Sequence, residues 1–226
     1  MTPDAALAAL EAAAEPGRAA QVAAYMKVER PYLGTPLPAV NALTQDWRRA
    51  LPLDARVALA DGLWETNIHE ARIAAAKLLT QARIKGDDDA VWRLIVSWLP
   101  DFDGWAIADH ACMAGQRRVA AHPDRLDEVA GWTASDHLWT KRAALVITLP
   151  WTKQNHPRPD ELAARDRVLG WAASYVDDPD WFIQKSVAWW LRELSKHDPD
   201  RVHAFLAAHG DRMKAFARKE AGKYLK

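Results

Sequence analysis

One acidic residue stands in an apolar stretch near the middle of the chain. The second half of 101-DFDGWAIADHACMAG-115 is mostly small and apolar, yet it includes Asp109, with Trp105 about one helical turn earlier. A carboxylate in such surroundings costs several kcal/mol of folding free energy unless a cation or a hydrogen-bond donor faces it. The pair therefore indicates either a structural ion pair, with Arg117 or Arg142 as the partner, or a carboxylate that acts on a ligand.

Basic and aromatic side chains gather on a later segment. On the helix expected over residues 181–194, Lys185, Trp189 and Arg192 fall at i, i+4 and i+7 and share one face. Trp190 falls in the apolar stripe of the same helix and is expected to be buried. The pattern predicts that Trp189 is displayed among cations.

Three further residues complete a candidate binding surface. Arg142 lies on an expected helix, Tyr25 at a helix end before a proline-marked turn, and Lys223 in a basic C-terminal helix. Basic side chains spaced along a surface suit a phosphate backbone, and aromatic faces suit a base or a cationic group. Asp109 would repel phosphate, so we expect it to face positive charge that is present or develops on the ligand.

The elements that must position these residues are helices. Alanine and leucine dominate, apolar residues recur at three- and four-residue spacing, and strand signals are nearly absent, which predicts an all-α chain. About eleven helices are expected from Pro36 onward, after a solvated Ala/Glu-rich capping helix and the helix that ends near Tyr25. Tight turns join these helices, and we expect them to stack as helix pairs.

A weak internal repeat indicates how the pairs are arranged. Its anchors are Arg72, Arg142 and Lys185, separated by 70 and 43 residues. The first gap has room for one more unit, and Asp109 lies near its middle, 37 residues after Arg72 and 33 before Arg142. Such spacings are typical of HEAT-like two-helix repeats. We therefore expect a right-handed-type superhelical solenoid that forms a single domain over residues 1–226. Its concave groove is expected to receive the side chains of Arg72, Asp109, Arg142 and Lys185.

Composition and sequence pattern exclude several classes of protein and of site. Thirty basic residues balance thirty acidic ones, so total charge points to no particular partner, and the single cysteine excludes a disulfide framework. No apolar run approaches about 18 residues and no signal peptide is recognised, so we expect a cytoplasmic, nucleoid-associated protein without a membrane span. His110 has no second histidine at i±4, so no metal site is predicted.

Five ordered sequence blocks carry a resemblance that covers nearly the whole chain. They are AYMKVERPYLG, the W-x-x-x-D of Trp105 and Asp109, LWTKRAAL, WFIQKSVAWWLRELSK and RKEAGKYL. Together they resemble the AlkD-type DNA alkylation repair glycosylases, which are HEAT-like repeat proteins. The WFIQK block is the most specific of the five, whereas the W-x-x-x-D spacing alone would be a weak signal.

The resemblance implies roles for particular residues. It places the functional tryptophans at Trp105 and Trp189, the acid at Asp109, an arginine at Arg142 and an aromatic residue at Tyr25. A different register would put the acid at Asp103, but the residue four positions earlier is then Leu99 instead of a tryptophan. The sequence departs from the family pattern at two places. It has Trp181-Phe182 in place of two phenylalanines, and Pro150-Trp151 where a basic residue is expected. Both differences could alter DNA binding or the size of the substrate that is accepted.

The resemblance also implies a reaction, which is hydrolysis of the N-glycosidic bond of purines alkylated at N3 or N7. In this reading Asp109 stabilises positive charge developing on the deoxyribose and positions water, while Trp105 and Trp189 flank the damaged nucleotide. Arg142 would hold a backbone phosphate, and Tyr25 is expected to bind DNA as the family's aromatic residue. Weaker candidates for phosphate contacts are Lys185, Arg192 and Lys223. The expected partner is double-stranded DNA with alkylated bases, bound by a monomer, and no metal or organic cofactor is required.

Two other function classes remain open. A non-catalytic relative would bind damaged or branched DNA without cleaving the bond. A protein-binding helical scaffold would have an apolar groove, which the arginines, lysines and lone aspartate disfavour. Ordinary structural roles are also open for the site residues: the tryptophans and Tyr25 as packing residues, and Arg142, Lys185 and Arg192 as solvated surface charges.

Overall fold

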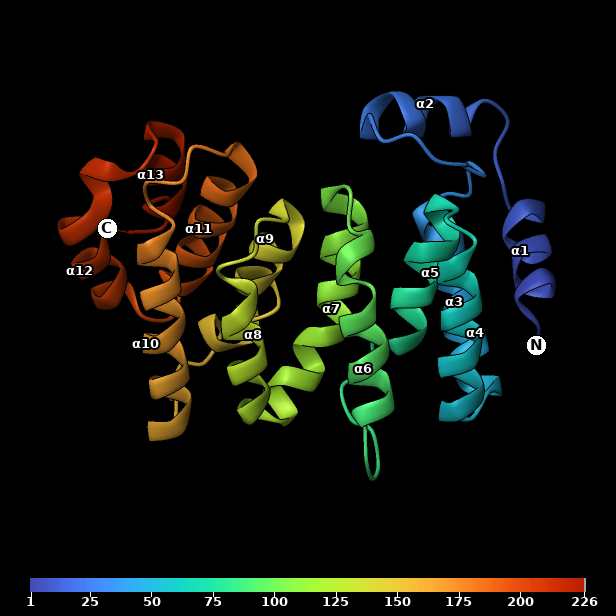
Figure 1. Cartoon of the computed structure of the whole chain (residues 1–226), viewed down its shortest axis with the longest axis horizontal. Coiled ribbons are helices and arrows are strands. Elements are labelled where there is room, and N and C mark those ends of the chain that lie inside the picture. The colour runs from blue at the N-terminus through green and yellow to red at the C-terminus, as the bar shows by residue number, and fades with distance from the viewer. Residues whose placement is uncertain (226) are drawn as a thin grey trace. The chain divides into compact units, whose positions relative to one another are not determined.

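The computed structural model describes residues 1–225, and within them every regular element is a helix (Figure 1). The predicted all-α class is therefore confirmed. The α-helices are α1 (Pro3–Ala12), α2 (Arg18–Met26), α3 (Leu37–Ala50), α4 (Leu53–Glu65), α5 (His69–Leu79), α6 (Asp89–Ser97), α7 (Trp105–Ala121), α8 (Leu126–Trp132), α9 (Leu138–Val146), α10 (Pro159–Ser174), α11 (Trp181–Leu194), α12 (Pro199–His209) and α13 (Ala215–Ala221). Short 3₁₀ helices lie at Leu99–Asp101, Pro123–Arg125, Leu149–Thr152 and Gly210–Arg212.

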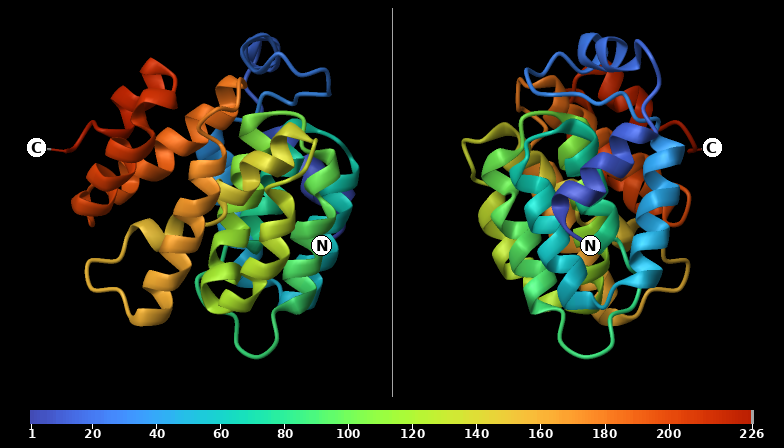
Figure 2. Two further views of the ribbon diagram at one scale, coloured as in Figure 1. Left: turned by 60° about the vertical axis from the view of Figure 1, so that its left-hand side comes forward. Right: turned by 90° about the vertical axis from the view of Figure 1, so that its right-hand side faces the viewer.

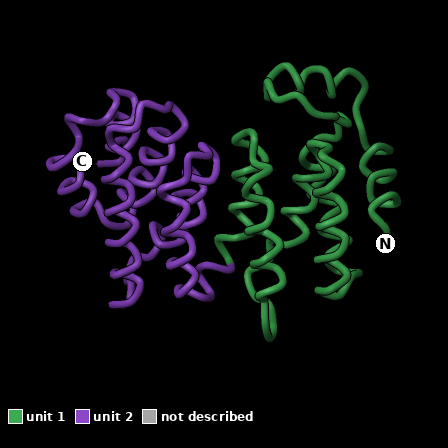
Figure 3. Tube along the Cα trace, in the orientation of Figure 1, with its two compact units in different colours: residues 1–117 green, residues 118–226 purple. Residues whose placement is uncertain are grey.

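The chain forms two compact units, residues 1–117 and 118–226, with the boundary inside α7 (Figure 3). The expectation of one domain over residues 1–226 stays a prediction. None of the helices within residues 1–225 is both long enough and apolar enough to cross a membrane.

Unit 1 is built on a stack of helices in which α5 packs against both α3 and α4. Its core contains two parallel indoles, Trp64 and Trp98, with ring centroids 4.2 Å apart. Arg72, which we expected to line the groove, is buried instead. Its guanidinium lies 4.7 Å from the Trp64 ring and donates through Nε to the Trp64 carbonyl, which also accepts from the backbone N–H of Asn67 just beyond the end of α4.

Helix α2 runs across the ends of the neighbouring helices of unit 1 (Figures 1 and 2). The loop after it is held by the buried carboxylate of Glu70, which accepts hydrogen bonds from the backbone N–H groups of Leu33 and Gly34 at 2.9 and 2.8 Å. Gly34 has φ +84°, and a Cβ there would lie 2.7 Å from the backbone nitrogen of Ala19. Only glycine therefore lets this loop pass so close to α2.

In unit 2, α11 packs between α9 and α13. The Asp180 carboxylate caps α11 by accepting from the N–H groups of Phe182 and Ile183. The buried amide of Gln184 donates to the carbonyls of Tyr175 and Val176, both at 2.9 Å, and so joins α11 to the end of α10. Helix α11 has the predicted bounds, and Trp190 is completely buried, as its place in the apolar stripe predicted.

Candidate functional site

Unit 1 places three of the predicted site residues on α2 and α7. Trp105 is the first residue of α7 and is 36% exposed, and Asp109 follows one turn later, partly exposed. Tyr25, near the end of α2, is 70% exposed and meets the Trp105 indole edge-on, with ring centroids 6.2 Å apart. Large aromatic side chains are costly to leave in water, so an exposed pair beside a carboxylate is typical of a binding surface.

Charged residues lie under this pair. Arg30, whose side chain is 1% exposed, forms an ion pair with Asp103, two residues before Trp105. Both residues line a small cavity together with Tyr32, His69 and Trp105. Burial lowers the pKa of His69, while the nearby Glu70 carboxylate acts in the opposite direction.

The ion pair also bears on the alternative register of the acidic residue. Asp103, the other candidate acid, is engaged with Arg30 from the loop after α2. This contact assigns Asp103 a structural part in holding the start of α7. Sequence reasoning missed it, because no local signal links residues 73 positions apart.

Unit 2 brings two more predicted residues together. Arg142 on α9 is buried, donates from Nη1 to the carbonyl of Phe182 at 3.1 Å, and has its guanidinium carbon 6.0 Å from the centre of the Trp189 ring. Trp189 is partly exposed. The indole therefore lies near a cation of α9, whereas the spacing on α11 indicated Lys185 and Arg192 as its cationic neighbours. Arg142 is less accessible than a surface phosphate contact would be.

The two basic residues of α11 share one acidic partner. Lys185 and Arg192 each form an ion pair with a different oxygen of Glu220, on α13. Arg192 also lies 3.3 Å from the Glu193 carboxylate. These contacts neutralise much of the charge that the sequence assigned to phosphate binding.

The remaining predicted contact, Lys223, is exposed, with its ammonium 5.4 Å from the Tyr224 ring. Trp181, which stands where the family pattern has a phenylalanine, is exposed as well. Its indole is 49% accessible, stacks on Phe216 with centroids 5.6 Å apart, and lies 5.7 Å from the Lys185 ammonium. Unit 2 therefore presents an aromatic surface that two phenylalanines would not reproduce.

The chemistry available to these residues is electrostatic. Indole and phenol faces attract cationic groups and stack on bases, and a fixed carboxylate stabilises positive charge. Within residues 1–225, no group of three or more His, Cys, Asp or Glu residues is placed to hold a metal ion. The functional roles of the eight predicted residues stay predictions.

Comparison with known proteins gives consistent results. The family model described as DNA alkylation repair enzyme matches residues 6–225. A predicted DNA alkylation repair enzyme from Enterococcus faecalis is similar in structure, with a TM-score of 0.77 and 22% identity over 94% of this chain and 96% of that one.

Two proteins from Streptococcus mutans also share the fold. AlkD2 has a TM-score of 0.61 and 16% identity, covering 92% of this chain and 97% of its own. The protein smu.31, from strain UA159, has a TM-score of 0.60 and 18% identity, covering 84% of this chain and 93% of its own. A search of curated proteins found no matching sequence.

Proposed function

Because this chain belongs to the family of DNA alkylation repair enzymes, we propose that it is a DNA glycosylase acting on purines alkylated at N3 or N7. The observation that carries this proposal is in unit 1, where the exposed Tyr25–Trp105 pair lies one helical turn from Asp109 on α7. A cationic base or a sugar that becomes cationic is the ligand that such a surface suits best.

The reaction follows from the charge of the damaged base. Alkylation makes the purine a cation, so when the bond between C1′ and the base nitrogen breaks, the base leaves with the electron pair as a neutral molecule. Positive charge then develops on the deoxyribose, and the Asp109 carboxylate stabilises it. A water oxygen adds to C1′ and its proton is released, with Asp109 in reach to orient that water.

The aromatic residues have a separate role. Trp105 and Tyr25 offer π-faces to the damaged nucleotide, and Trp189 does so in unit 2. Contacts of this kind favour a cationic purine over a neutral one, which supplies selectivity for the lesion.

The basic residues hold the DNA backbone. Lys223 is exposed and ready to contact a phosphate, and Arg142 is assigned the same role next to Trp189. Lys185 and Arg192 contribute to phosphate binding to the extent that a phosphate replaces Glu220 as their partner. Double-stranded DNA is the substrate in this proposal, bound by a monomer, and the mechanism uses no metal or organic cofactor.

The test is release of free base. A duplex with one N7-methylguanine is incubated with the wild-type chain, with Asp109→Asn, and with Asp61→Asn, which changes an exposed acid of α4 in the same way. We expect release by the wild type, a loss of about 100-fold or more in Asp109→Asn, and no loss in the control. Duplex binding without release by the wild type would instead support the non-catalytic alternative, and an undiminished rate in Asp109→Asn would remove the assigned role.

A further inference from the structure

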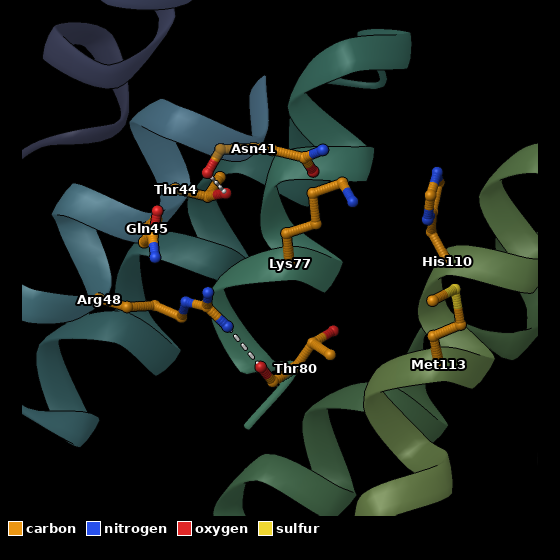
Figure 4. Close-up of a pocket in the computed structure, with 8 residues that line it drawn as sticks. All are labelled: Asn41, Thr44, Gln45, Arg48, Lys77, Thr80, His110 and Met113. Carbon is orange, nitrogen blue, oxygen red and sulfur yellow. Dashed lines mark hydrogen bonds between the residues drawn. The ribbon is translucent and has the colours of Figure 1, made fainter. Parts of the chain in front are cut away.

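A polar pocket that the sequence did not indicate lies in unit 1, among α3, α5 and α7 (Figure 4). Its charged residues are Arg48 and Lys77, and its neutral polar ones include Asn41, Gln45, Thr80 and His110. Asn41, Gln45 and Met113 are exposed, so solvent reaches the lining of the pocket. We refer to it as the Lys77 pocket.

The charge of the Lys77 pocket is not compensated. No carboxylate lines it, and within residues 1–225 neither Arg48 nor Lys77 forms an ion pair with an acid. Arg48 donates from Nη1 to the Thr80 carbonyl, which fixes its guanidinium against the pocket wall (Figure 4). Burial, and after it the charge of Arg48, lowers the pKa of Lys77.

A third cation reinforces the same charge. Arg56 lines an adjoining cavity with Arg48, is buried, and donates to the side-chain oxygen of Gln81. Burial and then Arg48 lower the pKa of Arg56. Three clustered cations without an acid destabilise the folded chain by mutual repulsion, and such an arrangement is typical of a site that an anion occupies.

The neutral residues of the pocket are suited to the same ligand. Burial, followed by the charges of Lys77 and His69, lowers the pKa of His110 to about 4, so at pH 7 its imidazole is uncharged and retains one N–H donor. The exposed amides of Asn41 and Gln45 supply further donors. Hydrogen-bond donors around two positive charges match the oxygens of a phosphate group.

We propose that the Lys77 pocket binds a phosphate of the DNA backbone near the damaged nucleotide; this inference rests on the proposed function, because the ligand is the same DNA. Helix α7 carries both Trp105 and His110, which are five residues apart, or about 7.5 Å along the helix axis. Successive phosphates of one strand advance by about 3.4 Å along a duplex. A phosphate in this pocket therefore lies within a few nucleotides of the lesion and fixes the register of the DNA on α7.

The experiment measures the affinity of a short undamaged duplex over a series of salt concentrations. We expect Lys77→Met to weaken binding roughly 3- to 10-fold and to reduce the slope of log affinity against log salt by about 1. The matched control is Lys85→Met, an exposed lysine of the loop after α5, which leaves both quantities unchanged. A urea midpoint for Lys77→Met equal to or above that of the wild type is expected, because a half-buried, uncompensated charge is removed.

Three results would overturn the inference. If Lys77→Met binds the duplex with wild-type affinity and slope while the wild type still releases base, the pocket proposal fails and the glycosylase proposal stands. If the wild type binds no duplex, both fail. If inorganic phosphate perturbs the His110 resonances of the wild type and Lys77→Met leaves duplex binding unchanged, the pocket takes a free phosphate ligand instead of DNA.

Discussion

The ion pair beneath Trp105 gives a sharp prediction about stability. Asp103→Asn removes the charge that faces Arg30 while leaving a side chain of nearly the same size. Arg30 is 1% exposed at its side chain, and its Nε and Nη1 atoms have no hydrogen-bond partner within residues 1–225. The substitution therefore leaves a buried guanidinium with little compensation.

The magnitude follows from how far solvent reaches the pair. Breaking a fully buried ion pair costs about 3–5 kcal/mol, whereas a fully exposed pair is worth about 0–1 kcal/mol. The Asp103 side chain is 43% exposed, so water screens one partner but hardly the other. We expect the free energy of unfolding to fall by about 1–3 kcal/mol.

Urea unfolding followed by tryptophan fluorescence measures this change. The control is Asp46→Asn, which breaks the Arg49–Asp46 pair, whose side chains are 69% and 72% exposed, and should cost less than about 0.5 kcal/mol. The double variant Arg30→Met/Asp103→Asn should recover part of the loss, because the unpaired charge is gone. Equal effects of Asp103→Asn and Asp46→Asn would refute the argument from burial.

Two further predictions concern charge. Glu220→Gln frees Lys185 from its carboxylate and leaves Arg192 with Glu193 alone, so duplex affinity should rise roughly 3- to 10-fold and its salt dependence should steepen. Anisotropy measures both quantities, with the exposed Asp200→Asn as the control, and unchanged or weaker binding would contradict the prediction. The pKa of His110, about 4 against an ordinary 6.5, means that between these pH values the unfolded chain binds a proton that the folded chain does not. Stability should therefore fall as the pH drops from about 6.5 to 4, less steeply in His110→Gln, and an NMR titration midpoint near 6.5 would show the reasoning to be wrong.

Local pattern was enough to predict the secondary structure and the family. Apolar spacing predicted the helices, including the bounds of α11 and the burial of Trp190, because these depend on which residues recur on one face. Five ordered blocks, each a local string, indicated the family that the match over residues 6–225 establishes. The T-shaped contact of Tyr25 with Trp105 required coordinates, since α2 and α7 are far apart in sequence.

The partners of the charged residues were decided only by the tertiary structure. Arg72 is buried against Trp64, and Lys185 and Arg192 meet Glu220, although their helical positions resemble those of free surface cations. The Lys77 pocket likewise depends on three helices that are distant in the chain. A sequence fixes the type of each side chain and its face on its own helix, but the charge that a site presents depends on which distant groups fall within a few ångströms, because electrostatic interactions depend on distance and burial.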